Sequence, residues 1–185
     1  AVTFIVSAAL IVSCRLPAPT PVETSGGVLA NTTWGIRAYL ATPRLKGLLA
    51  LSLAVSLAGA MVIVNTVVYV RELLGRSETE LAVILAFYGA GSMVVALSLP
   101  RLLERLPDRP VMLSGGIVLA VALIAATSMP DFAGLAAIWF FLGVGGSLIQ
   151  TPAGRLLKRS SSDETRAPIY AAQFALSHAC WLIAY

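Results

Sequence analysis

Apolar residues along this chain form long blocks separated by short polar stretches. Four blocks, at about 48–70, 80–99, 111–129 and 133–150, carry no charged residue in their interiors. A helix that rises about 1.5 Å per residue needs about 20 residues to cross a hydrocarbon core of about 30 Å. The pattern therefore predicts four complete transmembrane helices and an all-α membrane protein.

Two further apolar runs lie at the ends of the chain. Residues 1–13 are apolar but too short to span a bilayer, and they lack the basic start of a signal peptide. Residues 168–185 are mostly apolar and stop without a polar flank. We expect both to be truncated transmembrane helices, and the chain to be a fragment of a larger protein.

Residues 14–46 form the longest polar connection and separate the first run from a bundle predicted over residues 47–185. Prolines and glycines exclude a regular element from the first half of this connection. Its second half carries Trp34, Ile36, Tyr39 and Leu40. This half is compatible with a short helix lying at the membrane interface and equally with an ordinary loop.

Local signals place several helix starts and contacts. Ser77 and Glu80 have the spacing of a capping box, which predicts a helix start just before residue 81. Gly89 and Gly91 would let a neighbouring helix approach closely. The run 111–129 is apolar on every face, so we expect much of its surface to face lipid.

The basic residues set the predicted topology. The stretches Arg101–Pro110 (RLLERLPDRP) and Arg155–Arg166 (RLLKRSSSDETR) are expected to be strongly basic loops. If the runs cross the membrane alternately, eleven of the 13 basic residues share one side, and only Arg71 and Arg76 lie on the other. Positively charged loops stay in the cytoplasm, so the side with eleven is predicted to be cytoplasmic.

Composition supports the membrane assignment. The chain is 58% hydrophobic and 12% charged, with a mean hydropathy of +0.86, which is outside the range of soluble globular domains. Its net charge of +4 lies in loops next to apolar runs. Topology and contact with anionic lipid explain such a charge, so no nucleic-acid partner is expected. Cys14 and Cys180 adjoin or lie within apolar runs, so no disulfide framework is expected either.

Several motifs, in their order and spacing, resemble the major facilitator superfamily. RAYLATPRLKGLL and YVRELLGRSETELAVILAFYGAGS are similar to segments of bacterial drug and siderophore exporters. PRLLERLPDR resembles a degenerate second copy of the family's loop motif, with Pro100 and Pro107 in place of glycines and Asp108 in place of a basic residue. KRSSSDETRAPIYAAQFALSH resembles the loop between the tenth and eleventh helices.

The resemblance implies a secondary active transporter that exports a small molecule by alternating access. The chain would run from the end of the sixth to the start of the eleventh helix, as part of the C-terminal six-helix half of a twelve-helix protein. Implied partners are a small-molecule or ion substrate, the lipid bilayer and the missing N-terminal half. The implied location is the inner (plasma) membrane, as a multi-pass protein. No cofactor and no enzymatic activity are expected, since no nucleophile or acid–base pair is evident at membrane depth.

Candidate substrate contacts are neutral, because no acidic or basic residue lies inside a complete span. By the resemblance, the seventh and tenth helices would line the cavity. The candidates for the substrate cavity are Asn65, Tyr69, Gln150, Gln173 and His178. Each of these side chains could instead form an interhelical hydrogen bond or an interfacial anchor.

Charged residues in the cytoplasmic loops are candidates for gating. Arg105 or Arg109 could pair with Asp163 or Glu164 when the cytoplasmic side is closed, and these charges could equally serve only to fix the topology. The full candidate set comprises Glu104, Arg105, Arg109, Asp163, Glu164 and Arg166.

Two other functions remain open. SHACW (Ser177–Trp181) resembles a nickel-efflux-like branch of the superfamily, which leaves export of a metal ion as an alternative. His178 and Cys180 are two positions apart on a helix and cannot chelate one ion by themselves, so no metal site is predicted. A membrane sensor or scaffold that does not transport is the second alternative.

Overall fold

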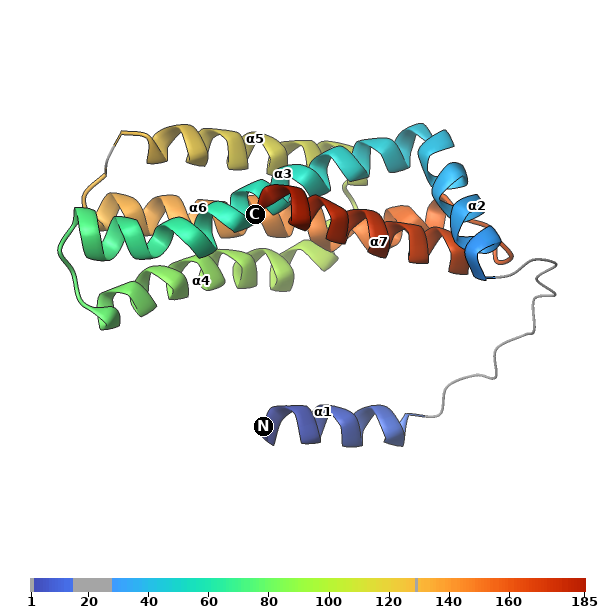
Figure 1. Ribbon diagram of the computed structural model, residues 1–185, viewed down its shortest axis with the longest axis horizontal. Helices are drawn as coiled ribbons and strands as arrows, with labels where there is room; N and C mark the ends of the chain where they lie inside the picture. Colours follow the sequence, from blue (N-terminus) through green and yellow to red (C-terminus); the bar gives the residue numbers. More distant parts are fainter. Residues whose placement is uncertain (1, 15–27, 129) are drawn as a thin grey trace.

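A computed structural model describes residues 2–14, 28–128 and 130–185, and within these ranges every regular element is a helix (Figure 1). The elements are α1 (Val2–Ser13), α2 (Val28–Ala41), α3 (Pro43–Val67), the π-helical turn η1 (Val68–Leu73), α4 (Glu78–Leu102), α5 (Asp108–Ala126), α6 (Phe132–Arg159) and α7 (Arg166–Ala184).

Four segments of the described chain are long and apolar enough to cross a membrane: Pro43–Leu73, Glu78–Arg101, Asp108–Ala126 and Phe132–Arg159. They correspond to the four predicted spans, and the all-α membrane class is confirmed. Helix α7 is 19 residues long but more polar, and it is not among these four.

Several helices extend beyond the predicted spans. Helix α3 begins at Pro43, inside the expected connection, and α4 continues through Pro100 to Leu102. Helix α6 continues through Pro152 to Arg159, so Arg155 and Lys158 lie on a helix and not in a loop. Basic side chains favour the last turn of a helix because the backbone dipole is negative there. Met129, the predicted end of the third span, lies outside the described residues.

Helix α6 is the centre of the bundle, with α4 and α5 packed along it (Figure 1). Two glycine contacts allow these close approaches. A Cβ added at Gly91 would collide with the Phe140 carbonyl of α6, and one added at Gly115 would lie 2.8 Å from the Gly145 carbonyl. The close approach predicted at Gly91 is confirmed, but Gly89 has open space around it and makes no such contact.

Helix α5 has one buried and one exposed side, although its residues from Val111 onward are apolar on both sides. One stripe is buried against the bundle: Val111, Met112, Gly115, Leu119, Ala122 and Ala126. The opposite stripe is largely exposed: Leu113, Ile117, Val121 and Ile124. An exposed apolar surface is therefore present on one side of α5 only, and its contact with lipid stays a prediction.

Local signals fix the start of α4 and the end of η1. Ser77 Oγ accepts from the Glu80 amide and the Glu80 carboxylate accepts from the Ser77 amide, so the predicted capping box is confirmed. Gly75 follows η1 with a φ of +62°, a left-handed conformation that glycine adopts without a steric penalty.

Helices α2, α3 and α7 form a second layer of contacts. The second half of the polar connection is helical, and α2 packs on α7 where Gly35 meets the Pro168 carbonyl. Helix α7 also packs on α3, where the ring of Trp181 lies over Gly59. The apolar side chains of α1 from Phe4 onward are exposed, and Figure 1 shows this helix apart from the bundle.

Candidate functional site

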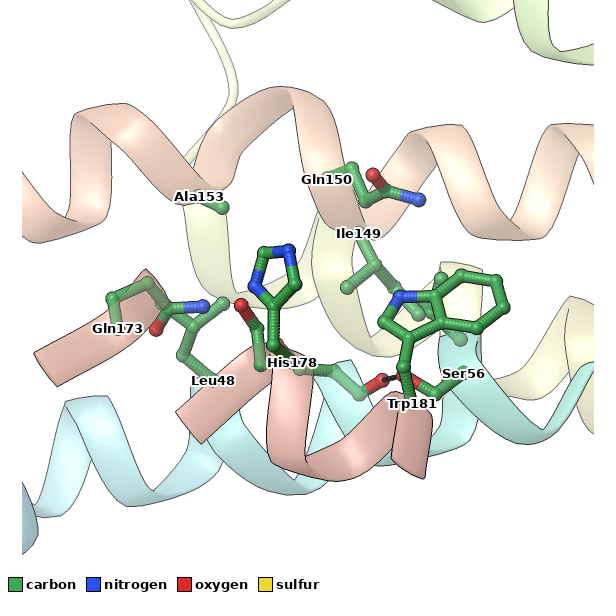
Figure 2. A pocket seen from close by; sticks show the side chains of 11 residues that line it. Leu48, Ser56, Ile149, Gln150, Ala153, Gln173, His178 and Trp181 are labelled. Carbon is green, nitrogen blue, oxygen red and sulfur yellow. Dashed lines mark hydrogen bonds between the residues drawn. The ribbon is translucent and has the colours of Figure 1, made fainter. Parts of the chain in front are cut away.

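A cavity of about 290 Å³ lies between α3, α6 and α7 (Figure 2). This volume is near the lower end of the range for small-molecule sites, about 300–1,000 Å³. The lining combines an apolar wall with a few polar groups. It consists of Leu48, Ser52, Val55, Ser56, Ile149, Gln150, Ala153, Gln173, Ser177, His178 and Trp181.

Several polar groups of the lining are bonded within their own helices. Ser56 Oγ donates to the Ser52 carbonyl at 3.0 Å, and Ser177 Oγ donates to the Phe174 carbonyl at 3.0 Å. Nδ1 of His178 lies 2.7 Å from the same Phe174 carbonyl, and the His178 ring contacts the Phe174 ring with centroids 4.0 Å apart and planes tilted by 37°. A carbonyl only accepts, so Nδ1 is the donor in this contact, and in the neutral form of the ring Nε2 is an acceptor.

Gln173 is held from outside the cavity. The hydroxyl of Tyr39, on α2, donates to Oε1 of Gln173. Tyr39 is fully buried, and this burial raises the pKa of its hydroxyl above the ordinary value, so the hydroxyl stays protonated and able to donate. The hydrogen bond joins the polar connection before the bundle to a residue of the cavity wall.

A charged cluster lies at the end of α6 nearest the turn between α4 and α5. Asp108, the first residue of α5, is buried, with an exposed fraction of 6%. Its Oδ1 accepts from Arg155 Nε at 2.6 Å and its Oδ2 accepts from Arg159 Nη1 at 2.9 Å. Arg155 also donates to the carbonyls of Leu103 and Leu106, at 2.6 and 3.3 Å, and so ties the turn to α6.

A family model described as Major Facilitator Superfamily matches residues 2–184. The chain belongs to the major facilitator superfamily. No curated protein and no solved structure matches the chain. Membership in this family makes it a membrane transporter in general terms, which agrees with its four membrane-length helices.

Three of the five cavity candidates in this major facilitator chain meet at the cavity: Gln150 from α6, and Gln173 and His178 from α7. Asn65 and Tyr69 do not line it. Tyr69 donates to the Ala126 carbonyl at 2.9 Å and contacts Trp139 edge to face, at 5.6 Å between centroids. Its position in η1 matches the alternative of an interhelical hydrogen bond.

Sequence reasoning missed Ser52, Ser56, Ser177 and Trp181 as lining residues. A helical signal was present for all four. Ser52 and Ser56 are four residues apart, and Gln173, Ser177 and Trp181 recur at the same interval, so each set shares one helix face.

The gating candidates are not paired as expected in this structure. Arg166 pairs with Asp163 at 2.6 Å, three residues away on the same chain segment. Glu104, Arg105, Arg109 and Glu164 are exposed, and the described chain offers none of them an ion pair. Asp108 stands where the family motif has a basic residue, and it attracts the two arginines of α6 instead.

The described residues contain no group of three or more His, Cys, Asp or Glu side chains placed to hold a metal ion. His178 faces the cavity, whereas Cys180 is buried and is not among the lining residues. The pair H-x-C therefore points in two directions, as expected for positions two apart on a helix.

Proposed function

We propose that this chain forms part of a secondary active transporter that exports a small molecule across the cytoplasmic membrane by alternating access. The solute binds in the cavity between α3, α6 and α7. One observation carries the proposal: Gln150, Gln173 and His178, from two different helices, meet in a cavity whose remaining wall is largely apolar. A few placed polar groups in an apolar cavity are typical of small-molecule sites.

The position of the cavity suggests how access would alternate. It lies along the first part of α3, the last part of α6 and α7, which are the cytoplasmic ends of α3 and α6 under the predicted topology. A second bundle rocking against this one would open the cavity to each side in turn. The direction of transport, outward, rests on the similarity of Tyr69–Ser92 to exporters.

The exposed loop charges would adjust this equilibrium. We place Glu104, Arg105, Arg109, Asp163, Glu164 and Arg166 at the cytoplasmic rim, where pairs form and break as the cavity closes and opens. Exposed ion pairs contribute about 0–1 kcal/mol each, which can bias two states of similar free energy but cannot lock one of them.

Accessibility of the cavity from both sides tests alternating access. In a background with Cys14 and Cys180 replaced, Ser177→Cys adds a thiol to the cavity wall with little change in size. A membrane-impermeant thiol reagent should label this variant when supplied from either side of sealed vesicles that contain the intact protein. Labelling from one side alone would overturn the proposal and favour a membrane sensor or scaffold.

Ser98→Cys is the matched control for this labelling. Ser98 lies on the exposed side of α4, and its hydroxyl donates to the Val94 carbonyl at 2.6 Å, as a helical serine at membrane depth does. It is not part of the cavity lining. We expect no labelling from either side, because Ser98 lies inside the apolar span Glu78–Arg101 and outside the cavity, where a charged reagent is excluded.

A further inference from the structure

The polar groups of the cavity carry no formal charge. Within the described part of the chain, the lining contains carboxamides, hydroxyls, an indole and an imidazole, and no Asp, Glu, Lys or Arg. A charged solute would lose hydration against this wall and find no counter-charge on it. An uncharged solute loses only hydrogen bonds with water, which the wall can replace.

The orientation of the Gln173 amide is fixed by its partner. Because Tyr39 donates to Oε1, the amide oxygen is occupied and the NH₂ group is directed elsewhere. Figure 2 shows the Gln173 nitrogen on the side of the amide nearer to His178. This nitrogen has no hydrogen-bond partner among the described residues, so it is a free donor at the cavity wall.

The orientation of the His178 ring is fixed in a complementary way. Nδ1 donates to the Phe174 carbonyl, which leaves Nε2 as an acceptor without a partner among the described residues. Donor and acceptor lie five residues apart on α7, and Figure 2 shows both side chains on the cavity side of that helix. The indole of Trp181 and the side chain of Leu48 supply apolar surface beside them.

We propose that Tyr39 sets the hydrogen-bond pattern of the cavity, so that Gln173 presents a donor to the same cavity that His178 lines with an acceptor. The site then selects an uncharged solute with both an acceptor and a donor, such as an aromatic carboxamide. A carbonyl oxygen of the solute accepts from Gln173, its N–H donates to His178 Nε2, and its ring packs on Trp181. This assignment rests on the proposed transport function. Tyr39 does not touch the solute and acts as a positioning residue through Gln173.

The packing around Tyr39 restricts the movement of its side chain and so fixes the Gln173 amide that it holds. Helix α2 is pressed onto α7 where a Cβ added at Gly35 would lie 2.6 Å from the Pro168 carbonyl. Tyr39 itself has an exposed fraction of 0%. A buried side chain between two packed helices has little freedom to leave its partner, so the amide it holds is preorganised for binding.

Binding of four probes to the intact protein in detergent, measured by titration calorimetry, tests this assignment. Benzamide offers an acceptor and a donor, N,N-dimethylbenzamide lacks the donor, and benzoate and benzylammonium carry opposite charges. We expect benzamide to bind about fivefold or more tightly than each of the others, since one hydrogen bond contributes about 1 kcal/mol. Benzoate or benzylammonium binding as tightly as benzamide, or no benzamide binding, would overturn the uncharged-solute assignment.

Variants separate the role of Tyr39 from general packing. Tyr39→Phe should weaken benzamide binding about fivefold and reduce its preference over N,N-dimethylbenzamide, because the Gln173 amide is then free to turn over. Tyr170→Phe is the matched control: the hydroxyl of Tyr170 joins α7 to α6 by donating to the Gly154 carbonyl at 3.1 Å, and both residues lie outside the cavity lining. It should change benzamide affinity by less than about twofold.

A double-mutant cycle gives the last readout. Gln173→Leu should remove the benzamide preference by itself, and Tyr39→Phe added to it should have no further effect. Additive losses, or an unchanged probe preference in Tyr39→Phe, would overturn the positioning role. Two-sided labelling of Ser177→Cys does not depend on the solute, so it would still hold if only this inference failed.

Discussion

Asp108 Oδ1 lies 2.6 Å from Nε of Arg155, and this contact joins the first residue of α5 to the last third of α6. The carboxylate is buried and also accepts from Arg159, while Arg155 donates onward to two carbonyls of the turn before α5. The cluster therefore closes the end of the α4–α5 hairpin onto α6. It is the densest charge network among the described residues.

Asp108→Asn should destabilise the bundle by about 1–3 kcal/mol. The substitution removes the charge that compensates Arg155, and bonds to charged groups contribute about 1.5–3 kcal/mol each when buried. The measurement is the free energy of unfolding in mixed detergent, followed by circular dichroism. Asp163→Asn is the matched control, because Asp163 is largely exposed in its pair with Arg166 and should change stability by less than about 1 kcal/mol. Equal effects of the two substitutions would show that burial of Asp108 contributes nothing.

The packing of α4 on α6 predicts a contrast between two glycines. Gly91→Ala places a methyl group against the Phe140 carbonyl, and backbone cannot move aside as a flexible side chain can. We expect a loss of about 1–3 kcal/mol in the free energy of unfolding. Gly89→Ala, two residues earlier on the same helix, meets open space and should be neutral or stabilising by up to about 1 kcal/mol. A Gly91→Ala protein as stable as the native one would contradict the contact.

The spans and the cap at Ser77 could be predicted from the sequence because their causes are local. The length of an apolar run is itself the requirement for crossing a bilayer, and a capping box involves four consecutive residues. The pairing of Asp108 with Arg155 could not be predicted from the sequence, since it depends on where α5 begins, where α6 ends and how each helix is rotated about its axis. The bond from Tyr39 to Gln173 spans 134 residues of sequence and depends on α2 being a helix docked on α7.

The same distinction explains which cavity residues were found. Gln150, Gln173 and His178 were selected as polar residues in apolar runs, and the structure brings them to one cavity. Tyr69 met the same criterion, but η1 directs its hydroxyl to the Ala126 carbonyl. Polarity within a span indicates that a partner exists, and only the packing shows whether that partner is a helix or a solute.

The gating proposal predicts an effect on transport without an effect on folding. Arg105 is exposed in this structure and has no ion pair in the described part of the chain. Arg105→Glu should therefore leave the free energy of unfolding within about 0.5 kcal/mol of the native value. If Arg105 pairs with Asp163 or Glu164 in the closed state, the reversal should shift labelling of Ser177→Cys towards the cytoplasmic side by up to about fivefold. Unchanged labelling in a correctly inserted protein would show that Arg105 serves only the topology.

The last prediction concerns the orientation of the chain in the membrane, and the structure indicates which exposed positions are suitable for thiol labelling. Leu106 lies in the turn between α4 and α5 with 40% of its side chain exposed, whereas its neighbour Leu103 is buried and would be a poor probe. Glu72, before the turn at the other end of α4, is also exposed.

In the background without Cys14 and Cys180, Leu106→Cys should react with an impermeant thiol reagent only after cells are permeabilised, and Glu72→Cys should react in intact cells. The reason is that three arginines lie in the Arg101–Pro110 stretch and positive charge is retained in the cytoplasm. The reverse pattern would place the end of α6 that lines the cavity, with Gln150, on the outer side, and export would no longer follow from this arrangement.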